Sequence, residues 1–139
     1  MDNSMDIVEF FVPGIPAPKG SKKAFVRGKR AVLVNANEKT KPWEASVSAA
    51  AYEHWTMQGN AMLDEPVHMV LLFTMPQPTS RKKVKECDRK PDIDKLARSV
   101  LDALSGIVFV DDSRVTKLNC SKIYGIPGVK IWIAKSTKN

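Results

Sequence analysis

Four aspartates in two short segments are the residues of this sequence best suited to chemistry. Asp92 and Asp94 follow Pro91 and are separated by one residue, whereas Asp111 and Asp112 are adjacent. Carboxylate oxygens are the ligands that hard divalent cations such as Mg²⁺ prefer. A cation held by such groups can activate water for attack on a phosphodiester and stabilise the negative transition state. The aspartates therefore indicate metal-dependent cleavage of a phosphodiester.

The basic residues of the chain indicate a partner that carries phosphate. The sequence has 22 Lys and Arg residues against 15 Asp and Glu residues, a net charge of +7. Since bare carboxylates repel DNA, a cation at the aspartates would also resolve the conflict between an acidic site and a polyanionic substrate. We expect phosphate contacts from two basic segments and from one residue between Asp92 and Arg98, namely Lys19, Lys22, Lys23, Arg27, Lys82, Lys83, Lys85, Arg89, Lys90 and Lys95.

The pattern of apolar residues predicts an α/β (α+β) fold, a mixed β-sheet with two main helices. Alternating or continuous apolar runs predict strands, and apolar residues spaced three and four apart predict helices. The strand over residues 67–74 is apolar almost throughout and is predicted to be buried on both faces, with His68 packed inside. The predicted elements, in the order βββαβαββ, are strands at 7–12, 24–26 and 31–34, a helix at 42–58, a strand at 67–74, a helix at 93–105 and strands at 115–124 and 129–133.

Length and composition predict a single domain, residues 1–139. The chain is 43% hydrophobic and has no long uncharged apolar run, so we expect a soluble, cytoplasmic protein without a membrane segment. Its two cysteines are too few for a disulfide framework or a thiolate zinc site.

The geometry of the first aspartate pair depends on where the helix begins. If extended backbone continues from Pro91 through Asp94, the two carboxylates point to one side. A metal site at this pair therefore requires a helix that does not begin before Asp92. The alternative is that Asp92 or Asp94 only caps the helix. Asp111 and Asp112 are equally compatible with a solvated turn.

Arg98 is open to two interpretations. It is spaced four residues from both Asp94 and Asp102, which predicts an ordinary ion-pair ladder on the surface of the helix. The alternative is that Arg98 binds the scissile phosphate and stabilises its developing charge.

Three elements of this region resemble the signature of the RusA-like Holliday junction resolvase (crossover junction endodeoxyribonuclease) family. The family pattern has a D-x-D-N-L start, a D-A-L helix end and a D-D-x-x-V close. The matching segments are Lys90-Pro91-Asp92-Ile93-Asp94-Lys95-Leu96, Val100-Leu101-Asp102-Ala103-Leu104-Ser105-Gly106 and Val110-Asp111-Asp112-Ser113-Arg114-Val115. The resemblance is most specific over these residues, 90–115, and extends more weakly to the early proline-rich segment, which has basic residues between 19 and 23.

The resemblance implies a homodimeric nuclease that nicks four-way DNA junctions symmetrically with Mg²⁺ or Mn²⁺. The essential aspartates of the family correspond to Asp92, Asp94 and Asp112, with Asp111 as a supporting acid and Asp102 as a structural or supporting one. Lys95 stands where the family has Asn, and Arg98 stands where it has a catalytic lysine. Arginine keeps the charge but does not readily transfer a proton, so Arg98 can replace that lysine only electrostatically.

Two alternatives remain open at this stage. One is a non-catalytic basic protein that binds nucleic acid, in which the acids only cap helices and form ion pairs. The other is a branched-DNA nuclease that prefers flaps or forks. A bacterial and a bacteriophage source are equally compatible with the sequence.

Overall fold

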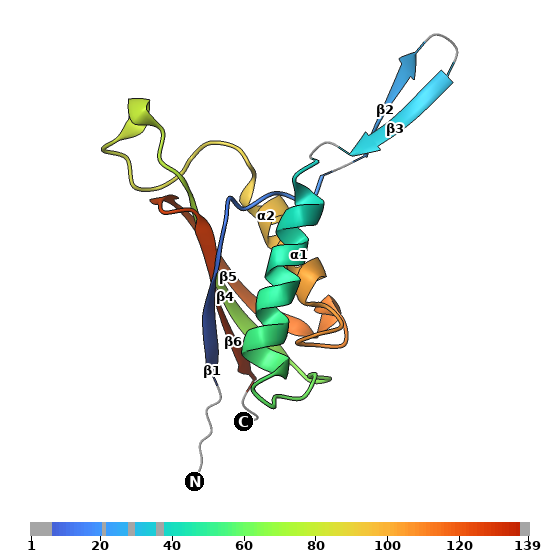
Figure 1. Cartoon of the computed structure of the whole chain (residues 1–139), viewed down its shortest axis with the longest axis vertical. Coiled ribbons are helices and arrows are strands. Elements are labelled where there is room, and N and C mark those ends of the chain that lie inside the picture. The colour runs from blue at the N-terminus through green and yellow to red at the C-terminus, as the bar shows by residue number, and fades with distance from the viewer. Residues whose placement is uncertain (1–6, 21, 28–29, 36–37, 137–139) are drawn as a thin grey trace.

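The fold has the predicted order βββαβαββ, an α+β arrangement of a mixed sheet and two main helices (Figure 1). The computed structural model describes residues 7–20, 22–27, 30–35 and 38–136, and the side chains of 7–20 and 38–136. The elements are β1 (Ile7–Pro13), β2 (Lys22–Arg27), β3 (Arg30–Asn35), α1 (Thr40–Ala51), β4 (Val67–Pro76), α2 (Ile93–Leu104), β5 (Val115–Gly125) and β6 (Gly128–Lys135). A π-helical turn at Tyr52–Thr56 continues α1, and 3₁₀ turns lie at Thr79–Arg81 and Asp112–Arg114.

Four strands form the main sheet in the order β1-β6-β4-β5. β4 and β5 run parallel, whereas the other two pairs are antiparallel. Both helices pack on one face of this sheet (Figure 1). β2 and β3, both predicted as strands, pair with each other as a separate hairpin that projects from the body.

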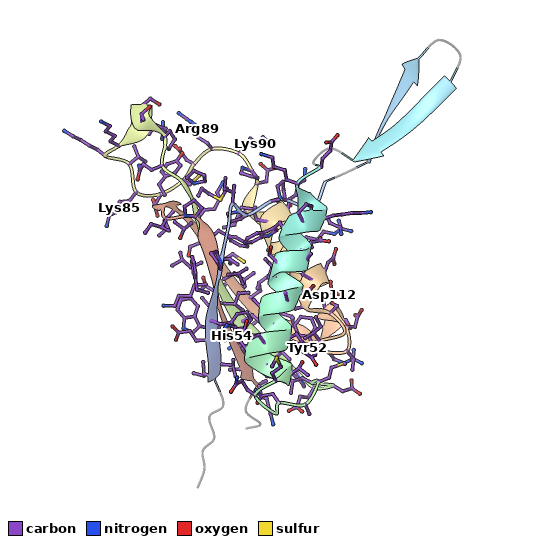
Figure 2. The ribbon with its side chains drawn as sticks, viewed as in Figure 1. Tyr52, His54, Lys85, Arg89, Lys90 and Asp112 are labelled. Carbon is purple, nitrogen blue, oxygen red and sulfur yellow. The ribbon has the colours of Figure 1, made fainter. Side chains whose placement is uncertain are left out.

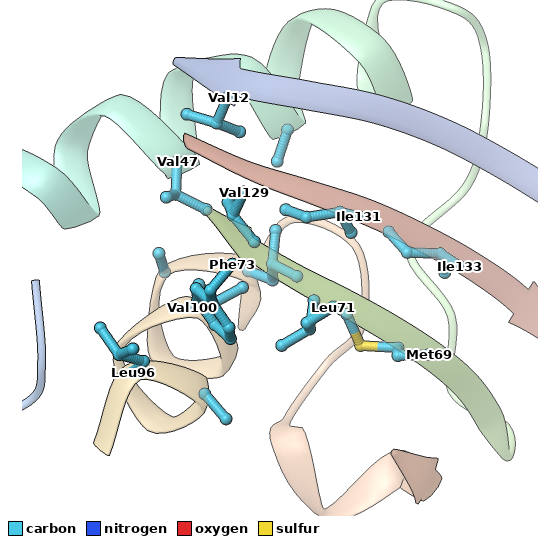
Figure 3. Close-up of a cluster of buried hydrophobic side chains, with 14 of the residues drawn as sticks. Val12, Val47, Met69, Leu71, Phe73, Leu96, Val100, Val129, Ile131 and Ile133 are labelled. Atoms are coloured by element: carbon cyan, nitrogen blue, oxygen red, sulfur yellow. The ribbon is translucent and has the colours of Figure 1, made fainter. Parts of the chain in front are cut away.

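The core lies between the sheet and the helices, on one face of each strand. In β4 the burial alternates, so that Leu71 and Phe73 are fully buried while Val70 and Leu72 on the other face are partly exposed. The prediction that β4 is buried on both faces is therefore wrong, because the helices cover only one face. His68 lies half-buried on the face opposite the helices. Figure 3 shows the inward side chains of β4 and β6 packed against the helices.

Helix α2 is fixed in rotation by its apolar side. Leu96, Val100 and Leu104 are fully buried at spacings of four residues, which places them on one face of the helix. Burial of each such side chain stabilises the fold by about 1.5–3 kcal/mol. The start of α2, with its two aspartates, is thereby held at a defined edge of the core.

The proline-rich segment after β1 is fastened across α2. The hydroxyl of Ser99, which is fully buried, donates a 2.7 Å hydrogen bond to the carbonyl of Ala17. The backbone N–H of Lys19 donates to the carbonyl of Lys95 at 2.9 Å. This segment therefore stays close to the first turns of α2.

None of the helices in the described part of the chain is long and apolar enough to cross a membrane.

The alternating burial predicts that Leu→Ala substitutions in two neighbouring strands lower the free energy of unfolding by different amounts. Leu71→Ala removes a fully buried side chain and should lower the free energy of unfolding by about 2–5 kcal/mol. Leu118→Ala is the matched control, because Leu118 is 41% exposed. This substitution should lower the free energy of unfolding much less. Urea denaturation of both variants measures the difference, and equal losses would contradict the placement of the core.

Candidate active site

Asp92 and Asp94 lie at the start of α2 and line the same hollow. Asp92 is the residue before the first helical turn and has extended backbone, with φ −69° and ψ 140°. The helix begins at Ile93, as predicted, so the extended backbone ends at Asp92 and does not continue through Asp94. Both residues nevertheless line one open hollow of about 850 Å³. This is possible because Asp92 lies outside the helix, so the angular spacing of helical residues does not separate the pair.

The carboxylate of Asp92 does not cap the helix. Its side chain makes no capping hydrogen bond, although its backbone carbonyl accepts the first helical bond, from the N–H of Leu96 at 3.1 Å. The carboxylate lies instead beside two lysines: Lys90 Nζ is 3.0 Å from Oδ1, and Lys95 Nζ is 3.9 Å from Oδ2. The hydrogen bond and charge of Lys90, helped by the charges of Lys95 and Lys122, lower the pKa of Asp92. Asp92 is therefore ionised at neutral pH.

Lys122 belongs to this site and was not predicted from the sequence. Its Nζ donates hydrogen bonds to the carbonyls of Arg89 and Pro91, at 2.5 and 2.6 Å. It lies in β5, where one lysine in a strand carries no signal of function. Backbone bonds also join this part of the chain to β5, from Cys87 N to Lys122 O at 3.1 Å and from Tyr124 N to Lys85 O at 2.8 Å. The basic segment is thus attached to the sheet beside the aspartates.

Exposed basic side chains gather at this end of the molecule. Figure 2 shows Lys85, Arg89 and Lys90 together, where the loop after β4 leads into α2. The other predicted phosphate contacts of the loop, Lys82 and Lys83, are also exposed. The predicted contacts Lys22, Lys23 and Arg27 have backbone in the hairpin, but their side chains lie outside the described residues.

Arg98 and Asp102 do not form the ion-pair ladder that their spacing allows. Asp102 pairs with Lys19 at 3.1 Å, and the same ammonium lies 3.0 Å from Glu44 of α1. These hydrogen bonds, that to Glu44 first, raise the pKa of Lys19. Lys19 therefore bridges the two helices, and its predicted contact with DNA stays a prediction. Arg98 is exposed, and no salt bridge to it occurs among the described residues.

The second aspartate pair lies in the turn before β5. Asp111 accepts a 2.9 Å hydrogen bond from the backbone N–H of Ser113, and its bonds to Ser113 lower the pKa of Asp111. Asp112 is partly buried and begins the 3₁₀ turn. In Figure 2 it lies well apart from Lys90, and its 3₁₀ turn contacts α2.

The aspartates have the right chemistry for Mg²⁺ or Mn²⁺, but they are not gathered into a complete ligand set. Within the described part of the chain, no group of three or more His, Cys, Asp or Glu side chains could hold a metal ion. The donor chemistry fits a hard cation, but the described chain by itself does not bring a complete set of ligands together. The assignment of Asp92, Asp94 and Asp112 as ligands stays a prediction.

Comparison with known proteins identifies the family. The family model for endodeoxyribonuclease RusA matches residues 13–134. The chain belongs to the RusA family. This family model extends from the last residue of β1 to Ala134 of β6, and includes both helices and both aspartate pairs. A similar protein is the uncharacterized protein YqaN of Bacillus subtilis (strain 168), which is 29% identical over 141 residues, 93% of this chain and 96% of the relative.

The lysine beside Asp92 gives this RusA-family site a measurable property. Lys90→Gln removes the main cause of the lowered pKa, so the pKa of the Asp92 carboxyl should rise. Since a lowered pKa stabilises the fold above the ordinary aspartate range, wild type should lose stability relative to the variant as the pH falls through the lowered pKa. Carbon NMR titration of the aspartate carboxyls measures the shift.

Lys85→Gln is the matched control, because Lys85 is exposed in the same loop and does not contribute to the lowered pKa of Asp92. An equal shift in both variants would show that the general charge of the loop, rather than the Lys90 contact, sets the pKa.

Proposed function

We propose that this chain is a metal-dependent endodeoxyribonuclease that resolves four-way DNA junctions by paired symmetric nicks in recombination and repair. The observation that carries the proposal is the placement of Asp92 and Asp94 in one open hollow beside exposed Arg89 and Lys90, in a member of the RusA family. The carboxylates proposed for catalysis then lie next to the basic side chains proposed to bind phosphate. A polyanionic strand can approach because the lysines balance the charge of Asp92.

The proposed roles follow the charges of the side chains. Asp92, Asp94 and Asp112 would hold the cofactor, Mg²⁺ or Mn²⁺, with Asp111 as a supporting acid. Arg98, exposed and without a salt bridge among the described residues, is available to bind a phosphate. Asp102 contributes by holding Lys19 between the helices rather than by touching substrate.

The proposed partners are branched DNA and a second copy of the chain. The exposed residues Lys82, Lys83, Lys85, Arg89, Lys90 and Lys95 would bind the DNA backbone, together with Lys22, Lys23 and Arg27 of the hairpin. Two identical sites related by a two-fold axis match the two strands that a resolvase must cut, so we propose a homodimer. We place it in the cytoplasm of a bacterium or a phage-infected cell.

A non-catalytic DNA-binding protein is the second candidate. It is favoured by the contact of Asp92 with Lys90 and by the spread of the aspartates over two places in the described structure. A nuclease specific for flaps or forks differs from the first proposal only in substrate.

Cleavage of a labelled four-way junction tests the first proposal. With Mg²⁺ or Mn²⁺, wild type should make paired nicks in the junction and leave a matched linear duplex intact. Asp94→Asn should still bind the junction but cleave it more slowly, by more than the roughly 10- to 100-fold expected when a group supporting a metal ligand is lost.

Asp64→Asn is the control, because Asp64 is an exposed acid that pairs with Arg114 at 2.8 Å and does not line the hollow. It should cleave like wild type. Binding without cleavage by wild type in both metals would reject the nuclease and support the binding protein. Faster cleavage of flaps or forks would change the assigned substrate.

The salt dependence of binding tests the basic loop. Lys82→Gln combined with Lys83→Gln should weaken binding to all sequences alike and reduce the slope of log K against log salt by about two units, since each phosphate contact contributes about one. Lys135→Gln, at the last residue of β6, should leave the slope unchanged. An unaltered slope in the double variant would show that DNA binds to another surface of the protein.

A further inference from the structure

The turn between β5 and β6 carries the most exposed large apolar side chain among the described residues. This side chain is Ile126, which is 84% exposed in the sequence Gly125-Ile126-Pro127-Gly128. Turn positions usually hold glycine, proline or polar residues, so the fold does not require an isoleucine at this place. Ile15, in the segment after β1, is also exposed, at 56%. Two branched apolar side chains are thus presented to solvent.

The β5–β6 turn is fastened to the end of β1. The backbone N–H of Gly14 donates a 3.2 Å hydrogen bond to the carbonyl of Pro127, so Ile15 and Ile126 flank the same bond. The ring of Phe11 lies directly on the backbone of Gly128, where a Cβ atom would overlap it. The ring of Pro127 also restricts the backbone of the turn. Ile126 therefore projects from a stiff support.

The basic loop lies beside this turn. The backbone N–H of Tyr124, two residues before Ile126, donates to the carbonyl of Lys85 at 2.8 Å. Figure 2 shows Lys85 at the same end of the molecule as the turn. Lys83 and Lys85 are both exposed. The apolar tip is therefore bordered by cations, a combination that suits a partner with a polyanionic backbone and apolar groups inside it.

The turn is also close to the hollow that contains the first aspartate pair. Ile123 of β5 lines this hollow together with Asp92 and Asp94. Ile126 follows Ile123 by three residues, which span at most about 11 Å of chain. Successive bases of one DNA strand are about 3.4 Å apart, so this length corresponds to about three base steps. A DNA strand with a phosphate at the aspartates would pass its bases near Ile126.

We propose that Ile126 is a wedge that enters between two base pairs of branched DNA next to the aspartate hollow, with Ile15 as its apolar neighbour. The proposal rests on the proposed function in one respect, that the ligand is branched DNA. Proteins that kink DNA insert apolar side chains, isoleucine among them, between base steps, and the cost of insertion is that of unstacking. Unstacking costs least where a base already lacks a complete set of neighbours, as at a branch point.

The wedge supplies a preference that the charges alone do not. Lysines that contact phosphates bind a linear duplex and a junction alike, because both carry the same backbone. An apolar side chain is removed from water only where the bases open to receive it. Ile126 therefore adds a preference for branched DNA to an affinity that the basic loop provides.

The fluorescence of 2-aminopurine, a base that is quenched when stacked, tests the wedge. A four-way junction with this base next to the branch point should brighten when wild type binds it in EDTA, without divalent metal. Ile126→Ser should lose most of the increase at saturating protein, whereas Ile126→Leu should keep it. Ile126→Ser should also reduce the preference for junction over linear duplex by about tenfold, the order expected when one apolar side chain is no longer buried.

Met57→Ser is the matched control, because Met57 is 66% exposed and follows the π-helical turn at the end of α1 that is remote from the basic loop (Figure 1). It should brighten the junction as wild type does. Circular dichroism establishes that each variant is folded. The proposal would be overturned by wild type that binds without brightening, by equal brightening with Ile126→Ser, or by an equal loss with Met57→Ser.

The outcomes separate this proposal from the proposed function. Brightening that Ile126→Ser abolishes, in a protein that never nicks junctions with Mg²⁺ or Mn²⁺, would keep the wedge and reject the nuclease. Nicking by wild type that brightens no base near the branch point would keep the nuclease and reject the wedge. If both proposals hold, the 2-aminopurine position that brightens most should lie within about three base steps of the nicked phosphate.

Discussion

The packing of α2 on the sheet is the constraint on which the site depends. Leu96, Val100 and Leu104 are fully buried and leave the helix no freedom to rotate. The rotation of α2 decides where Asp94 points, and its start decides where Asp92 lies. The hydrogen bond from Ser99 to the carbonyl of Ala17 holds the proline-rich segment against the same turns. Residues that pack in the core and residues proposed for the site thus alternate along one helix.

The elements that follow from local pattern were predicted well. The order of strands and helices is confirmed, as is the helix that begins after Asp92, because apolar spacing and turn residues act over a few neighbours. The burial of β4 on both faces was wrong, since the number of apolar residues in a strand does not reveal whether one layer or two covers it. The family was correctly recognised from three short segments around the aspartates.

The ion pairs of the site could not be predicted in the same way. Spacing allowed Asp102 to pair with Arg98, yet it pairs with Lys19, which is far away in the sequence and close in space. Lys122 likewise reaches the aspartate segment from β5. Long basic side chains can reach several acids, and tertiary packing decides between them. The same reasoning explains why two nearby carboxylates could be expected at α2 while the position of Asp112 relative to them could not.

The attachment of the loop after β4 has a consequence for binding. Lys122 holds the carbonyls of Arg89 and Pro91, and Gln77 Nε2 donates to the carbonyls of Arg81 and Val84, at 2.7 and 3.1 Å. Both ends of the basic loop are therefore ordered by the fold itself. Ordering a flexible segment during association weakens affinity. Here that entropy is lost when the chain folds, so a polyanion meets charges that are already arranged.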